Sequence, residues 1–257
     1  MPHHTANEFY RLIAPRYKQY RPRYPEALFR YLASLTPQHE TAWDCATGSG
    51  GQAARGLTAH FNRVIATDAV NEQVAIADPY PGVEFRCAPA EESGLDAASV
   101  NLVTVAQALH WFDLDRFYAE VQRVVVPGGV IAAWCYLLPV IDEGQLDRLV
   151  ADLFDATCLG DYWPSCRRHV DDGYQSLPFP FRELPSHRFT AEENWTLDSL
   201  VGYLHTWQAL TDSQDDPAAV AFVAAQTKRI AATWRRGKRA RRRVQWTLEL
   251  RVGQLPG

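Results

Sequence analysis

The residue types best suited to ligand chemistry lie in a short loop near residue 45 and at the end of the next apolar run. Asp44 opens the sequence D-C-A-T-G-S-G-G, and a second acid, Asp68, ends the apolar run 64–67. Glycines allow a backbone to approach a ligand closely, and an acid at a strand end suits the two hydroxyls of a ribose. A strand, a glycine-rich turn, a helix and a strand ending in an acid predict one nucleotide-binding half of a doubly wound α/β fold.

Two kinds of ligand fit this loop. From Gly48 the residues G-S-G-G-Q-A satisfy the loose dinucleotide pattern G-x-G-x-x-G/A, in which a pyrophosphate faces a helix N-terminus. From Asp44 the residues D-C-A-T-G-S-G resemble the first motif of class I S-adenosylmethionine (SAM)-dependent methyltransferases. A carboxylate at position 44 repels a pyrophosphate but can help to hold an ammonium group, directly or through water. The loop therefore favours SAM, with an NAD-type oxidoreductase as the alternative.

One position of the loop departs from the methyltransferase motif. Ala46 stands where the family has its first glycine. An extra methyl group is tolerated at such a position if the residue keeps a negative φ. The alanine makes the match to the motif less specific.

The elements that must position these residues alternate along the chain. Seven strand-like runs are predicted, over residues 41–45, 64–67, 83–87, 100–106, 130–136, 181–189 and 243–251. Helical patterns cover residues 7–18, 26–35, 116–126, 143–158, 195–210 and 217–234. This alternation predicts a doubly wound, Rossmann-like α/β fold, in which a mostly parallel seven-stranded sheet carries helices on both faces.

We expect a single domain over residues 1–257. Its parts are an N-terminal helical lid (1–40), a cofactor-binding core (41–137), and a region with a helical and aromatic cap and the last two strands (138–257). The cap is predicted from the aromatic residues and prolines of segment 160–180.

Composition is that of an ordinary cytoplasmic enzyme. The chain has 257 residues, 47% of them hydrophobic, and a net charge of −4, which gives no general attraction to nucleic acid or to an anionic membrane. No apolar run approaches the roughly 20 residues of a membrane span, and the first residues lack the pattern of a signal peptide. The five cysteines form no Cys-x-x-Cys pair, and no spacing of His, Cys and Asp predicts a metal site.

The middle of the chain extends the methyltransferase resemblance. Residues 101–113, N-L-V-T-V-A-Q-A-L-H-W-F-D, resemble the fourth-strand motif of small-molecule SAM methyltransferases. They are most similar to the methyltransferase type 11 group with trans-aconitate, juvenile hormone acid and biotin-pathway malonyl-carrier methyltransferases. Segments 88–91 and 126–130 resemble that family's adenine-flanking segment and its Pro-Gly-Gly turn. The resemblance covers residues 5–136 and implies SAM as the cofactor.

The resemblance also implies the site residues. Those expected to bind the cofactor are Asp44, Ala46, Thr47, Gly48, Gly50, Asp68, Ala90, Glu91 and Gln107. In the related family a basic and aromatic N-terminal segment folds over the cofactor, so Tyr20 or Arg21 is expected to line the pocket. An arginine there suits a carboxylate substrate, because its guanidinium can bind both oxygens.

The reaction predicted by these residues is methyl transfer to a small organic molecule, most simply to a carboxylate oxygen. An ionised carboxylate needs no general base, whereas a hydroxyl or an amine could use His110, the nearest candidate. Two alternatives remain. The basic run 235–243 could serve an RNA or amine methyltransferase, and the protein could bind SAM without catalysis. The sequence does not predict the oligomeric state.

Overall fold

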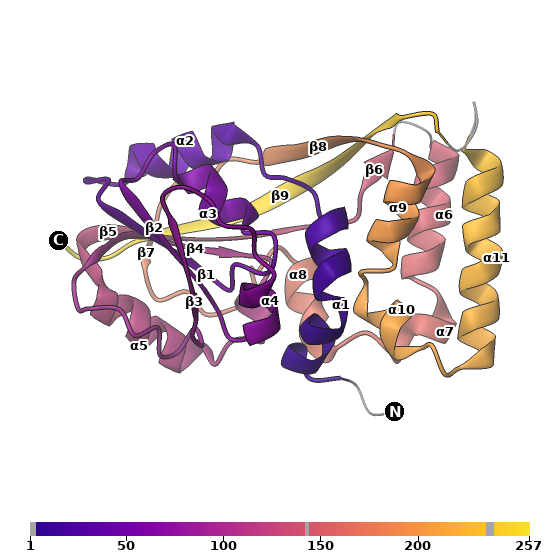
Figure 1. The fold of residues 1–257 in the computed structure, drawn as a ribbon, viewed down its shortest axis with the longest axis horizontal. Helices are drawn as coiled ribbons and strands as arrows, with labels where there is room; N and C mark the ends of the chain where they lie inside the picture. The colour runs from indigo at the N-terminus through magenta and orange to yellow at the C-terminus, as the bar shows by residue number, and fades with distance from the viewer. Residues whose placement is uncertain (1–3, 142–143, 235–238) are drawn as a thin grey trace.

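The computed structural model describes residues 4–141, 144–234 and 239–257 (Figure 1). In this part of the chain one sheet has the strand order β3-β2-β1-β4-β5-β9-β6, and β7 and β8 also pair with β9. The strands are β1 Thr41–Cys45, β2 Arg63–Asp68, β3 Val83–Cys87, β4 Val100–Ala106, β5 Val125–Tyr136, β6 Val140–Ile141, β7 Arg182–Glu183, β8 Phe189–Trp195 and β9 Arg242–Gln254.

Helices precede, connect and follow these strands. The α-helices are α1 Ala6–Tyr20, α2 Glu26–Leu35, α3 Gln52–Leu57, α4 Asn71–Ala75, α5 Leu114–Val124, α6 Gly144–Phe154, α7 Thr157–Gly160, α8 Arg168–Asp171, α9 Leu197–Leu204, α10 Gln208–Asp212 and α11 Pro217–Thr233. Strands β1 to β5 pair in parallel, and β9 runs antiparallel to β5. The α/β, Rossmann-like fold expected from the sequence is confirmed.

Alternate residues of the central strands enter two separate cores, one on each face of the sheet. On one face Ala42 of β1 packs in a cluster with Leu32 of α2 and Leu57 of α3. On the other face Trp43 packs in a cluster with Val121 of α5. The period of two along each strand therefore produces the layers of helix, sheet and helix.

The late strands join the first sheet, as expected, but their bounds differ from the prediction. The predicted strand 181–189 is interrupted: only β7 pairs with β9 there, and the longer strand β8 begins at Phe189. Pro185 lies in the interruption, and proline has no N–H to donate to a β-ladder. The pairing of β7, β8 and the short β6 with β9 gives the described part of the chain nine strands rather than seven.

The predicted helix 195–210 is two helices, α9 and α10. The hydroxyl of Thr206 donates to the carbonyl of Tyr203 at 2.6 Å, and such a local bond competes with continuation of a helix. Together with α6, α7 and α11 these helices form a group at one end of the molecule, and α1 stands between that group and the sheet (Figure 1). No helix in the described ranges has the length and apolar character needed to cross a membrane.

Only part of the basic run 235–243 lies in the described ranges. Residues 235–238 lie outside the described ranges, and Arg242 and Arg243 belong to β9. Arg241 donates to the carbonyl of Asn194 at 2.7 Å, and the guanidinium of Arg242 lies 5.2 Å from the centre of the Trp234 ring. Residues 241–243 of the run therefore lie at the end of the sheet, where β9 begins beside β8.

Candidate active site

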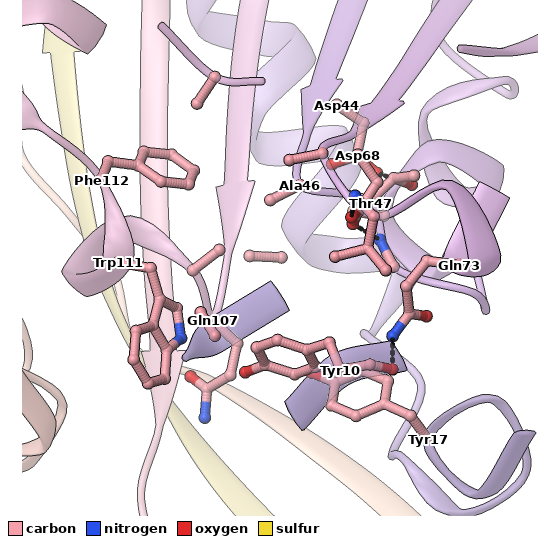
Figure 2. A pocket seen from close by; sticks show the side chains of 18 of the residues that line it. Tyr10, Tyr17, Asp44, Ala46, Thr47, Asp68, Gln73, Gln107, Trp111 and Phe112 are labelled. Carbon is pink, nitrogen blue, oxygen red and sulfur yellow. Dashed lines mark hydrogen bonds between the residues drawn. The ribbon is translucent and has the colours of Figure 1, made fainter. Parts of the chain in front are cut away.

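A cavity of about 300 Å³ lies at the carboxyl ends of β1, β2 and β4, where ligands bind in open α/β sheets. Figure 2 shows Asp44 and Asp68 on one side of it, Trp111 and Phe112 on the opposite side, and Tyr10 between them. Eight of the nine predicted cofactor residues line it: Asp44, Ala46, Thr47, Gly48, Asp68, Ala90, Glu91 and Gln107.

Asp44 organises the glycine-rich loop from its base. One carboxylate oxygen accepts hydrogen bonds from the Thr47 hydroxyl at 2.6 Å and the Ala54 N–H at 3.0 Å, and the other accepts from the Thr104 hydroxyl at 2.9 Å. Burial raises the pKa of Asp44 to about 6, although these hydrogen bonds act to lower it. Its remaining acceptor capacity and its charge face the cavity, which suits a cationic group of a ligand.

Asp68 holds the other end of the same loop. Its Oδ2 accepts the Gly48 N–H at 2.9 Å, and its Oδ1 accepts the Val70 N–H at 2.9 Å. Burial raises the pKa of this carboxyl above its usual value. Each oxygen keeps a further lone pair, so the carboxylate can receive two hydroxyl groups from a ligand in the cavity.

The backbone of Ala46 does not keep the negative φ at which an alanine is easily tolerated. Its φ is +54°, in the left-handed region that glycine occupies most easily. The condition of a negative φ is therefore not met, and the loop holds an alanine in a conformation that suits glycine. Gln107, at the end of β4, is also left-handed, with a φ of +62°. Non-glycine residues in this conformation cost free energy, and such residues gather at functional sites.

The end of β4 is tied to the neighbouring strand through the Gln107 side chain. Its Oε1 accepts the Tyr136 N–H at 2.9 Å, and its Nε2 donates to the Tyr136 carbonyl at 3.3 Å. The amide thus continues the ladder between β4 and β5 beyond the last paired residues. This pairing fixes the side chain at the cavity wall.

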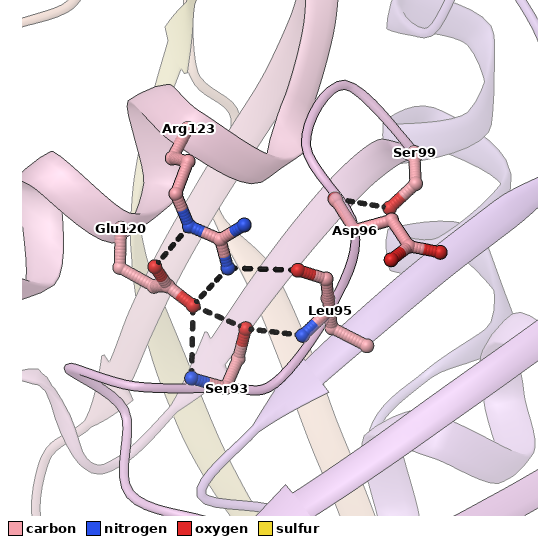
Figure 3. A network of polar contacts seen from close by, with 6 residues as sticks. All are labelled: Ser93, Leu95, Asp96, Ser99, Glu120 and Arg123. Carbon is pink, nitrogen blue, oxygen red and sulfur yellow. Dashed lines mark hydrogen bonds and ion pairs between the residues drawn. The ribbon is translucent and has the colours of Figure 1, made fainter.

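The loop after β3 is braced from α5. Glu120 accepts the Ser93 N–H at 2.8 Å and pairs with Arg123, whose Nη2 donates to the Leu95 carbonyl at 2.8 Å (Figure 3). Glu91 of this loop accepts the Asp113 N–H at 3.0 Å. The network positions the segment that brings Ala90 and Glu91 to the cavity.

Three predicted residues lie outside this cavity. Gly50 faces a different groove, and a Cβ added there would stand 2.5 Å from the Gln52 side chain. The Tyr20 ring packs against Gly202 of α9, away from the cavity. His110 borders a neighbouring, smaller cavity. The structure therefore separates these three positions from the cofactor cavity, although Tyr20 is adjacent in sequence to a residue that does line it.

The segment predicted to form a lid contributes α1 to the cavity wall, together with two wall residues that the sequence analysis did not name. Tyr10 and Tyr17 of α1 line the cavity, and Tyr17 lies against Gly48. Their spacing of seven residues places them on one helix face, a signal that was present in the sequence. The helix is held over the loop because Ser49 donates to the Ala14 carbonyl and Gln73 donates to the Tyr10 carbonyl, both at 2.9 Å.

A second cavity, of about 60 Å³, adjoins the first and reaches toward the cap. Arg21 lines both: its Nη1 donates to the Tyr136 hydroxyl at 2.7 Å and its Nη2 to the Thr206 carbonyl at 3.0 Å. Its Nε, like the indole N–H of Trp111, is buried and has no hydrogen-bond partner in the described part of the chain. The residues common to both cavities are Tyr10, Arg21, Gln107, Trp111 and Tyr136.

Comparisons with known proteins agree with this arrangement. Residues 43–133 match the family model of a methyltransferase domain. A Dictyostelium discoideum protein described as a methyltransferase is 31% identical over 197 residues, which are 76% of this chain and 74% of the relative. A solved structure described as a type II methyltransferase from Anaeromyxobacter dehalogenans has a TM-score of 0.83 and 42% identity, and covers 92% of this chain and 99% of its own.

The chain belongs to the SAM-dependent methyltransferases. SAM supplies an activated methyl group on a sulfonium, so the cofactor carries the difficult chemistry. The residues present fit this cofactor: Asp68 would receive the ribose hydroxyls, Asp44 and the loop 46–48 would hold the amino acid part, and segment 88–91 would flank the adenine. The methyltransferase itself must orient the acceptor and exclude water.

One further structure bears on the alternatives. The [4+2]-cyclase SpnF has a TM-score of 0.51 and 17% identity, and covers all of this chain and 99% of its own. At this identity the likeness shows the fold alone. The same architecture thus occurs in a protein described by another reaction, so the acceptor must be argued from the site.

Proposed function

We propose that this methyltransferase transfers a methyl group to a carboxylate oxygen of a small organic acid bound in the second cavity. The observation that carries the proposal is the guanidinium of Arg21, which borders both cavities and forms no ion pair with a carboxylate in the described ranges. A buried positive charge is costly unless an anion accompanies it. A carboxylate in the second cavity would supply that anion.

Two further observations support a carboxylate. The unpaired Nε of Arg21 and Nε1 of Trp111 are both donors, and a carboxylate offers only acceptors. Burial lowers the pKa of His110 to about 3, with additional effects of Arg167 and His169. A histidine with this pKa is a weak base near neutral pH, which disfavours an acceptor that must lose a proton.

Arg21 has a second possible ligand, the cofactor, and an experiment can distinguish this role from binding of the acceptor. Because it lines the first cavity as well, its guanidinium could bind the carboxylate of the cofactor's methionine part. S-adenosylhomocysteine (SAH) has that carboxylate, and 5′-methylthioadenosine lacks it. If Arg21 serves the acceptor, Arg21→Gln should leave the affinities for both compounds within about twofold of wild type. A selective loss of SAH binding would assign Arg21 to the cofactor instead.

The acceptor class is tested by a screen with methyl-labelled SAM. Organic acids, alcohols, amines and RNA are offered in parallel, and label released as volatile methanol by base identifies a methyl ester. Arg21→Gln should raise the KM for an acid about 10- to 100-fold, as expected for a lost hydrogen bond to a charged group. Arg23→Gln, a change at an arginine whose side chain is 82% exposed, is the matched control. Label in amines or RNA alone would refute the proposal.

A further inference from the structure

Tyr174 has an unusual backbone for a fully buried aromatic residue. Its φ is +66° and its side chain has no exposed surface. Only a few residues other than glycine adopt this left-handed conformation, and it costs free energy at each. The surrounding structure must therefore hold Tyr174 in this conformation.

Several contacts impose this conformation. The Tyr174 N–H donates to the His169 carbonyl at 2.7 Å, and its carbonyl accepts from Nη1 of Arg251 at 2.8 Å. Arg251 is itself held by Glu183, with 2.7 Å between Nη2 and the carboxylate. The position of the Tyr174 ring is thus fixed from both sides of its backbone.

The result of this arrangement is a contact between Tyr174 and His110. The Tyr174 hydroxyl lies 3.1 Å from Nδ1 of His110, and the two rings are 5.9 Å apart between centres. His110 lies in the short 3₁₀ helix Leu109–Trp111 that follows β4, and it borders the second cavity. Its other nitrogen, Nε2, has no hydrogen-bond partner among the described residues.

We propose that Tyr174 is a positioning residue: its hydroxyl donates to Nδ1 of His110, so that Nε2 carries the proton and presents an N–H donor to the acceptor's carboxylate. This inference rests on the proposed function, because it assigns the third donor of the same second cavity. The other two donors are Nε of Arg21 and Nε1 of Trp111, which have no protein partner there. The reverse tautomer would direct a lone pair of His110 at an anion.

The charge states of the pair agree with a neutral donor. Burial raises the pKa of Tyr174 well above its ordinary value, so the phenol keeps its proton. Burial also lowers the pKa of His110 to about 3, and the nearby Arg167 and His169 act in the same direction. Each partner therefore holds one proton at neutral pH, and the phenol is free to donate it to Nδ1 in a hydrogen bond.

The tautomer can be measured directly by ¹⁵N NMR of the histidine-labelled protein in complex with SAH, with His110→Gln to assign the signals. We expect the Nε2–H form for His110 in the wild-type protein, unchanged between pH 7.5 and 5. Tyr174→Phe keeps the ring and removes the hydroxyl, and it should shift His110 to a mixture of tautomers. Tyr118→Phe removes another buried hydroxyl, which donates to the Pro178 carbonyl at 2.7 Å, and should leave the His110 signals unchanged.

The probe for the donor role is sodium acetate, a carboxylate small enough for this cavity. Acetate should move the Nε2 resonance of the SAH complex, and Tyr174→Phe should weaken its apparent affinity at least fivefold while SAH affinity stays constant. An Nδ1–H tautomer in the wild-type protein would overturn the role of Tyr174 even if Tyr174→Phe failed to fold. An Nε2–H tautomer without a response to acetate would overturn the donor role and count against the carboxylate acceptor.

Discussion

The carboxylate of Asp68 accepts the backbone N–H of Gly48 at 2.9 Å, across 20 residues of sequence. This bond joins the end of β2 to the glycine-rich loop after β1. The acid predicted to bind the ribose therefore also fixes the loop predicted to hold the cofactor's amino acid part. One side chain couples the two motifs that predict SAM binding.

Replacement of Asp68 should weaken cofactor binding. Asp68→Ala removes both possible hydrogen bonds to the ribose and leaves the Gly48 N–H without its acceptor. We expect the affinity for SAH to fall by about 1–3 kcal/mol in isothermal titration calorimetry. Glu72→Ala, an exposed acid on the following helix, should change it little. Equal affinities of Asp68→Ala and wild type for SAH would show that Asp68 does not contribute to cofactor binding.

SAH binding should weaken as the pH falls through 6. Burial raises the pKa of Asp44 to about 6, so the free protein increasingly holds a neutral Asp44 below that pH. The ammonium of SAH favours the ionised form, and binding must then release the proton. The dissociation constant should be about tenfold higher at pH 5 than at pH 7.5. Asp44→Asn should bind weakly with a flatter pH profile, and an equally steep profile in this variant would assign the titration elsewhere.

Ala46→Gly should preserve or increase stability. The left-handed φ of +54° costs alanine about 1 kcal/mol, which glycine avoids, although glycine loses more entropy on folding. We expect the free energy of unfolding in urea to stay equal or rise by up to about 1 kcal/mol. Ala225→Gly, at an exposed position in the middle of α11, should instead lose about 1 kcal/mol. A similar loss in both variants would contradict the strain at Ala46.

Tyr17 and Tyr20 should differ sharply, although both belong to α1. Tyr17 lines the cofactor cavity, and its ring centre lies 4.4 Å from the guanidinium carbon of Arg21. Tyr17→Ala should therefore lower SAH affinity at least tenfold, whereas Tyr20→Phe should leave kcat and SAH affinity unchanged. Calorimetry and initial rates measure both. Strong loss of kcat in Tyr20→Phe would restore the place in the pocket that the sequence predicts for Tyr20.

The cofactor motif was predictable because its contacts are local. Asp44 lies near the end of β1, Thr47 and Gly48 follow within four residues, and strand alternation indicates where that loop begins. The conformation of Ala46 was not predictable from its residue type, since alanine prefers a negative φ. The tertiary bonds around the loop hold this residue in the conformation that glycine normally provides.

By itself, the sequence determined the fold class, the cofactor and the strands that carry it, because periodicity and glycine spacing report short-range structure. Only the tertiary structure decided which cap and lid residues meet the site. It selected Tyr17 over Tyr20, and it brought Tyr174 to His110 across 64 residues. It also ended the predicted strand near Pro185 and began β8 at Phe189. The contact between Tyr174 and His110 depends on packing between distant segments. Pro185 and the seven-residue spacing of Tyr10 and Tyr17 are local signals, but only the fold shows which of them matter.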